Sequence, residues 1–146
     1  MRYRSFLRSL AVAAALLVSL ETGTRAGDSF VVLVHRGNVV TSLSRSELKR
    51  IVTGGTRQWE SGAAVQLGII PAPVPETSSL GTLVDLTVRD LLARLQEQVF
   101  NGEIRRPVVL RSSTDCVALA RSNPGAICVA SSTFSGSPDV QVVTIR

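Results

Sequence analysis

Short apolar runs rich in β-branched residues alternate along this chain with segments of helical periodicity, and this alternation constrains the fold more than any other feature. Runs bounded by turn residues predict buried strands, whereas apolar residues at three- and four-residue steps predict helices. Strands that alternate with helices are typical of an α/β sheet covered by helices. The expected strands cover residues 30–34, 63–70, 107–110, 126–130 and 140–145.

Three segments predict the covering helices. Residues 44–52 begin with a capping box, in which Ser44 is followed three residues later by Glu47. Residues 79–99 carry an apolar stripe that predicts one continuous helix of about five turns. Residues 113–121 begin with hydroxyl residues and end before an Asn-Pro-Gly turn. The stripe of the long helix consists of Leu80, Leu83, Val84, Val88, Leu91, Leu92, Leu95 and Val99.

The first 26 residues are predicted to be a cleavable signal peptide. Arginines at positions 2, 4 and 8 precede an apolar run of about a dozen residues, too short to span a bilayer. Thr24 and Ala26 supply the small residues of a cleavage site, so cleavage near Ala26 is expected to leave residues 27–146 as one periplasmic or secreted domain. The alternative is an uncleaved N-terminal anchor helix.

The net charge of the chain without its predicted signal peptide argues against nucleic acid as a partner. Of the 16 basic residues 12 follow Ala26, as do 10 of the 11 acidic residues, so the exported part is nearly neutral. Its arginines are spread evenly and form no stripe that could follow a phosphate backbone.

Two cysteines, Cys116 and Cys128, lie in a predicted helix and in the strand that follows it. An oxidising compartment favours a disulfide between them, and the alternative is a pair of buried free thiols. The single histidine, His35, and these cysteines do not have the spacing of a zinc site, so neither a metal nor another cofactor is expected. The chain also lacks HExxH, GxSxG and phosphate-loop motifs, which disfavours an enzyme and leaves a hydrolase as a distant third hypothesis.

A hydroxyl-rich segment before the predicted long helix is the strongest candidate for a binding site. It contains Thr77, Ser78 and Ser79. The amino end of a helix presents unpaired N–H groups and a partial positive charge, which suit an oxyanion. We expect Ser78 to be the leading donor, with Arg111 offsetting the negative charge of Glu76. The alternative is that Ser78 or Ser79 only caps the helix.

Four short motifs follow one another along the chain: Ser42-Leu-Ser-Arg-Ser-Glu-Leu-Lys-Arg-Ile51, Arg57-Gln-Trp59, Val99-Phe-Asn-Gly102 and Asn123-Pro-Gly-Ala-Ile127. Taken in this order, they resemble motifs of the phosphate-ABC-transporter substrate-binding protein family. The resemblance implies the periplasmic-binding-protein fold, here as a single lobe with a mixed, mostly parallel sheet covered by helices. It also implies phosphate or a similar oxyanion as ligand, and a membrane transporter or envelope protein as partner.

The chain departs from that family at Gly81, where an arginine is common, at Arg94-Leu95, where an aromatic pair is expected, and at Cys128, where glycine is usual. Full-length phosphate receptors close two lobes over the ion, whereas this chain is long enough for one. The second hypothesis is therefore a domain without a ligand that serves as a structural or partner-docking protein of the cell envelope.

Overall fold

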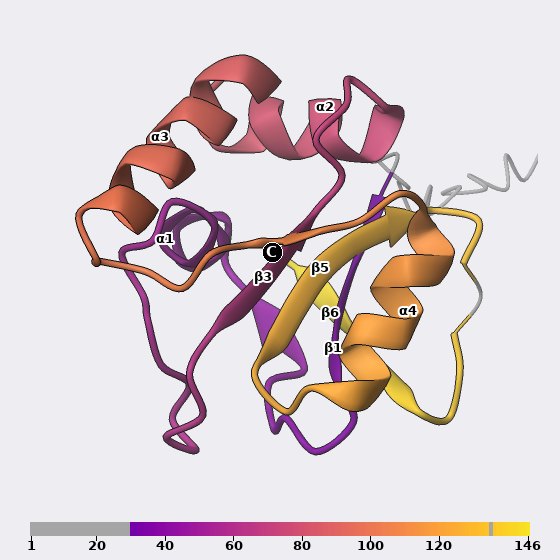
Figure 1. Ribbon diagram of the computed structural model, residues 1–146. Coiled ribbons are helices and arrows are strands. Elements are labelled where there is room, and N and C mark those ends of the chain that lie inside the picture. The colour runs from indigo at the N-terminus through magenta and orange to yellow at the C-terminus, as the bar shows by residue number, and fades with distance from the viewer. Residues whose placement is uncertain (1–29, 135) are drawn as a thin grey trace, which may run out of the picture.

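The computed structural model of the chain describes residues 30–134 and 136–146, and the predicted signal peptide with its cleavage site lies outside the described residues. Strands and helices alternate as the sequence predicts (Figure 1). In chain order the elements are β1 (Phe30–His35), β2 (Ser42–Leu43), α1 (Arg45–Val52), β3 (Gln66–Ile69), α2 (Pro75–Leu83), α3 (Val88–Phe100), β4 (Val108–Val109), α4 (Ser113–Ser122), β5 (Ala126–Ser131) and β6 (Val140–Ile145).

All six strands form one sheet in the order β2-β6-β1-β5-β3-β4. The pairs β2/β6, β3/β5 and β3/β4 are parallel, whereas β1 pairs antiparallel with both β5 and β6. Strand β1 therefore runs against the other five. This arrangement confirms the expected mixed, mostly parallel sheet.

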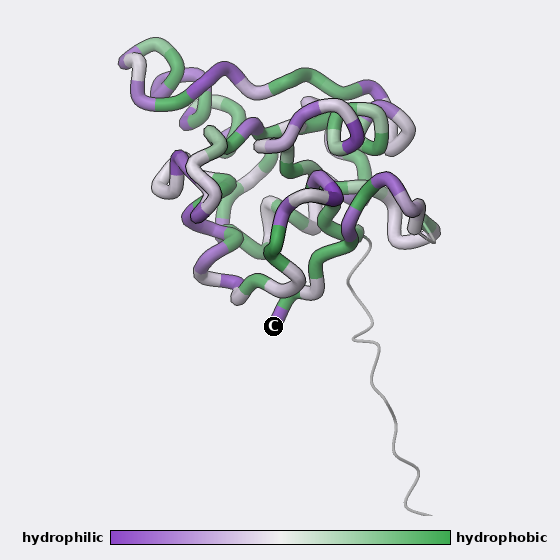
Figure 2. The backbone as a smooth tube through the Cα atoms, turned by 90° about the horizontal axis from the view of Figure 1, so that it is seen from below, coloured by the Kyte–Doolittle hydropathy of each residue, from purple (hydrophilic) through white to green (hydrophobic). Residues whose placement is uncertain are grey.

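Helices cover both faces of the sheet. Side chains of successive strand residues point to opposite faces, and both faces carry apolar residues that the helices bury. On β1, Val32 and Val34 belong to the core cluster beneath α1, α2 and α3, whereas Leu33 belongs to the cluster beneath α4 (Figure 1). Figure 2 shows hydrophobic stretches crossing the middle of the molecule and hydrophilic stretches mainly at its outer turns. The predicted single α/β lobe is confirmed.

The continuous helix predicted for residues 79–99 is wrong, because the chain forms two helices there, α2 and α3. Asp85 lies between them with a φ of 58°, in the left-handed region, and Thr87 caps α3 by accepting the N–H of Asp90 at 3.1 Å. The connection folds back on α2, since a Cβ at Gly81 would lie 2.6 Å from the carbonyl oxygen of Leu86. Both helices pack on the same sheet face, so their apolar stripes continue across the break.

The remaining differences concern where elements begin. Helix α2 starts at Pro75, so residues 77–79 lie inside it and not in a turn before it. Strand β2 is two residues long and was not expected from the sequence. No helix within the described part of the chain is long and apolar enough to cross a membrane.

Cys116 and Cys128 form a disulfide that joins α4 to β5, with their Cα atoms 5.8 Å apart. Of the two alternatives that the sequence leaves open, the structure contains the bridge. Both residues are buried in the core cluster beneath α4. The disulfide thus ties the helix that covers this face directly to the centre of the sheet.

Candidate anion-binding site

The predicted site residues belong to two segments, α2 and the start of α4, that begin at the same edge of the sheet but pack on opposite faces of it. Strands β3 and β4 are parallel neighbours, so their carboxyl ends lie at the same edge, where β3 leads to α2 and β4 leads to α4. Figure 1 shows the amino ends of both helices beside the carboxyl end of β5. We call this region the α2–α4 edge. Ligands of open α/β sheets commonly bind at the carboxyl ends of strands.

Helix α2 brings an uncapped amino end to the α2–α4 edge. Its N-cap residue, Val74, provides no side-chain hydrogen bond, and Pro75 has no N–H to donate. The first helical hydrogen bond of this turn joins the Ser78 N–H to the carbonyl oxygen of Val74 at 2.9 Å. Helix geometry therefore leaves the N–H groups of Glu76 and Thr77 without an intrahelical acceptor, at the positive end of the helix dipole.

The three predicted hydroxyl residues differ in their accessibility. Thr77 is fully buried and donates its hydroxyl to the carbonyl oxygen of Ile70 at 2.9 Å. Ser79 is half-buried and already has a partner. Ser78 is exposed, and its hydroxyl forms no hydrogen bond with another described residue. Since α2 begins at Pro75, neither serine occupies the N-cap position, and the alternative that one of them caps the helix is wrong.

The charged side chains considered for the α2–α4 edge are one arginine, Arg111, and two carboxylates, Asp115 and Glu76. The Arg111 side chain is 91% exposed, and its Nε lies 3.4 Å from the Asp115 carboxylate. That carboxylate also accepts the Arg111 backbone N–H at 2.9 Å. The backbone hydrogen bond and then the guanidinium lower the pKa of Asp115, so its carboxylate is charged at neutral pH. With Glu76 in the first turn of α2, these side chains carry one net negative charge, so only the positive helix ends favour an anion.

Hydroxyl residues that were not predicted from the sequence join α4 to β5. The Ser113 hydroxyl, in the first turn of α4, accepts the N–H of Ser131 at 2.8 Å. The hydroxyl of Ser131 also lies 2.9 Å from that of Thr133. The signal in the sequence is the hydroxyl run 131–133, which directly follows a predicted strand. These bonds hold the amino end of α4 against the sheet beside the predicted site.

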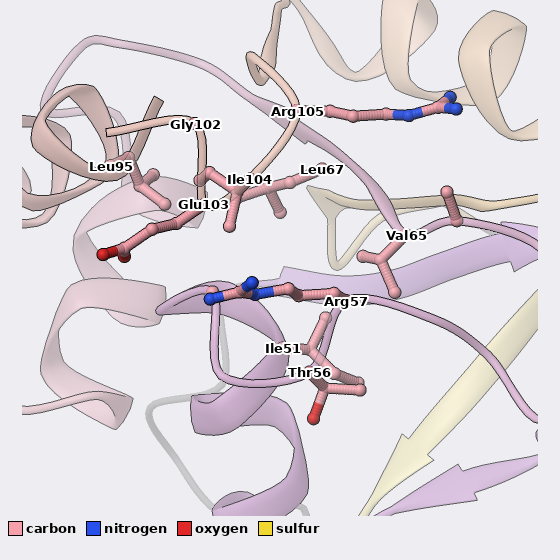
Figure 3. A pocket seen from close by; sticks show the side chains of 12 residues that line it. Ile51, Thr56, Arg57, Val65, Leu67, Leu95, Gly102, Glu103, Ile104 and Arg105 are labelled. Carbon is pink, nitrogen blue, oxygen red and sulfur yellow. The ribbon is translucent and has the colours of Figure 1, made fainter. Parts of the chain in front are cut away.

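Among the described residues, cavities also lie elsewhere, and three of these are not lined by Thr77, Ser78, Ser79 or Arg111. The first, of about 260 Å³, has the side chains of Arg57 and Glu103 near an apolar floor (Figure 3). The second, of about 340 Å³, lies between α3 and β4, and the third, of about 460 Å³, lies beside β2. Across residues 30–134 and 136–146, no group of His, Cys, Asp and Glu is placed to hold a metal ion.

Comparison with solved structures shows the fold of this chain in proteins of phosphate transport. A putative phosphate ABC transporter substrate-binding protein from Clostridium perfringens, with bound phosphate, superimposes with a TM-score of 0.63 at 17% identity, over 81% of this chain and 45% of that protein. An ABC-type phosphate transport receptor from Vibrio cholerae gives 0.62 at 17% identity, over 81% and 46%. PstS from Borrelia burgdorferi gives 0.58 at 12% identity, over 82% and 47%.

The chain thus spans about half the length of the proteins it superimposes on. At identities of 12–17% the likeness shows a common fold. No protein-family model and no curated protein matches the sequence.

Proposed function

We propose that this chain is an exported solute-binding module, not an enzyme, and that it binds phosphate or a related oxyanion at the amino end of α2. The observation that carries the proposal is the uncapped first turn of α2, where unpaired N–H groups lie next to the exposed Ser78 hydroxyl. N–H groups and a hydroxyl that converge at a positive helix end are the donors that a tetrahedral oxyanion needs.

In this proposal the three hydroxyl residues have different roles. Ser78 donates to the anion, and Ser79 lies beside it. Thr77 contributes its backbone N–H, because its hydroxyl hydrogen is used by Ile70. Arg111 offsets the charge of Glu76 only in part, since it is paired with Asp115. We therefore expect weak affinity, because the carboxylates of Glu76 and Asp115 oppose an anion.

The test is a calorimetric titration of phosphate into the purified protein and its Ser78→Ala variant. A hydroxyl bonded to a charged ligand contributes about 1.5 to 3 kcal/mol, so Ser78→Ala should weaken binding roughly ten- to a hundredfold. The matched control is Thr82→Ala, which removes another hydroxyl of α2 that is bonded to the Ser78 carbonyl oxygen. It should leave the affinity nearly unchanged.

The competing function is a docking protein of the cell envelope that keeps the fold without a ligand. It predicts that neither phosphate nor sulfate binds and that neither ion raises the melting temperature, which a ligand must do in proportion to RT ln(1 + [L]/Kd). Equal phosphate affinity in the wild type and in Ser78→Ala would place any anion site away from α2.

Export is the second part of the proposal, because the basic head, the apolar run and the Thr24-x-Ala26 pattern all fit a signal peptide. The intact mass of protein recovered from the periplasm or the medium should correspond to a chain that begins at or near Gly27. Recovery of the full-length chain in the membrane fraction would instead show an N-terminal anchor. A membrane transporter is the proposed partner of the exported module.

A further inference from the structure

An apolar groove lies between α3 and β4, where the sheet extends beyond the helices that cover it. Its floor consists of sheet residues and its wall of residues from α3, and its volume is about 340 Å³. Helix α3 packs over β3 through Leu95, which is almost completely buried, but it leaves the neighbouring face of β4 open. The apolar lining includes Ile69, Leu92, Leu95, Val99, Phe100 and Val109.

Two large apolar side chains at this groove are unusually exposed. Phe100 is 90% exposed and Val109 is 68% exposed. Removing apolar surface from water is favourable, and exposed apolar patches with a polar rim mark interaction sites. The groove therefore has surface whose burial by a partner is favourable.

Strand β4 supplies unpaired backbone groups along the same groove. It is the outermost strand of the sheet and pairs only with β3. The Leu110 N–H donates to the Ile69 carbonyl oxygen at 2.9 Å, toward β3. Because backbone groups alternate along a strand, the N–H and C=O of Val109 point away from β3. An extended segment placed beside β4 could bond to both groups and place its side chains in the groove.

The charge of the groove specifies the chemistry of the partner. Arg106 is the one charged residue of the lining, and no acidic residue lines the groove. Its backbone is fixed by Gln66, whose side-chain amide donates to the Arg106 carbonyl oxygen at 2.9 Å. The Arg106 guanidinium has no ion-pair partner among the described residues, and Arg105 precedes it in the chain. An acidic partner therefore complements the positive charge of Arg105 and Arg106.

We propose that the groove between α3 and β4 binds an extended segment of another protein in which apolar and acidic side chains alternate. The apolar side chains enter the groove beside Phe100 and Val109, and the carboxylates lie at Arg106. A second copy of this chain fits less well, since its own β4 edge, residues 105–111, contains three arginines and no acidic residue. This binding surface is independent of the proposed anion site at α2.

The test uses a fluorescent heptapeptide of alternating aspartate and valine and a matched peptide with lysine in place of aspartate. Fluorescence anisotropy should show that the protein binds the acidic peptide at least about tenfold more tightly than the basic one, as like charges oppose the latter. Phe100→Ser should weaken binding of the acidic peptide at least about tenfold, which is the loss expected when an apolar anchor is removed. Arg106→Glu should reverse the charge preference.

Two variants serve as matched controls. Val39→Ser alters another exposed apolar residue and Arg36→Glu another exposed arginine, both outside the groove, and neither should change peptide binding. Amide shifts in NMR spectra should be confined to residues 69–71 and 92–110, which contain the lining of the groove. Equal binding of both peptides, or of neither, overturns the proposal. It is also overturned by a dimer that Phe100→Ser dissociates, or by binding to vesicles of anionic lipid that replaces peptide binding.

Discussion

A single residue, Gly125, connects three segments at the base of the sheet. Its carbonyl oxygen accepts the Trp59 indole N–H at 3.0 Å and the Gln66 N–H at 2.8 Å. Its own N–H donates to the side chain of Asn123 at 2.9 Å. A Cβ at this position would overlap the carbonyl oxygen of Ala64, so the close approach of the backbones requires glycine.

We therefore expect Gly125→Ala to lower the free energy of unfolding by about 1 to 3 kcal/mol, the usual cost of overpacking, and urea denaturation measures it. Gly37→Ala is the control. Its Cβ would meet only the side chain of His35, at 3.1 Å, so its effect should stay within about 0.5 kcal/mol. Equal stability of the two variants would show that the backbone at Gly125 shifts without cost.

At the candidate site, the sequence alone does not predict which side chains are buried and which are exposed. The sequence places three hydroxyls near the start of a helix. The rotation of α2 about its own axis determines that Thr77 faces the core and that Ser78 faces solvent. Only the exact start of α2, at Pro75, fixes that rotation. The pairing of Arg111 with Asp115 could have been predicted, because residues four apart at the start of a helix are neighbours.

At the scale of elements, local signals with a specific geometry predict the structure well. The capping box of α1 is present as expected: the Ser44 N–H donates to the Glu47 carboxylate at 2.7 Å, and the Glu47 N–H donates to the Ser44 hydroxyl at 3.1 Å. Hydrophobic periodicity is less specific. It shows which face of a helix is buried, but it continued unchanged across the break at Asp85.

The capping box also predicts how stability depends on pH. Hydrogen bonds from the backbone and then the side chain of Ser44 lower the pKa of Glu47, and the N–H of Arg111 lowers the pKa of Asp115. A lowered pKa stabilises the fold above the ordinary carboxyl pKa of about 4, and this contribution is lost as the pH falls through the lower folded value.

Replacing these carboxylates by amides, in the double variant Glu47→Gln/Asp115→Asn, should therefore make the free energy of unfolding fall less steeply on acidification. Urea denaturation between pH 7 and pH 3 measures the slope. Glu60→Gln removes an exposed carboxylate that forms no hydrogen bond with a described residue, and it should keep the wild-type slope. If the double variant keeps that slope as well, the two carboxylates titrate alike in the folded and unfolded states.

At the scale of the whole molecule, the alternation of strands and helices was sufficient to predict one α/β layer arrangement, but not the order of the strands. Residues 30–34 predict a buried strand, and nothing in them indicates that β1 runs against its neighbours. Direction is set by long-range pairing with β5 and β6, which follow about a hundred residues later in the chain. Strand β2 pairs in parallel with β6, and its two residues are too short a segment to predict a strand from the sequence.

The disulfide matters at this scale because α4 is the one helix on its face of the described sheet. Cys116 and Cys128 are 12 residues apart, and in the chain-entropy model a loop of this length contributes roughly 3 kcal/mol by constraining the unfolded chain. Replacing both by alanine, or reducing the wild type with dithiothreitol, should lower the free energy of unfolding by about that amount. Urea denaturation of the oxidised, reduced and substituted proteins provides the measurement.

The free energies of unfolding of the reduced protein and of the double-alanine variant should agree to within about 1 kcal/mol, since both lack the cross-link. If the oxidised and reduced proteins are equally stable, packing of α4 against β5 alone holds this face together.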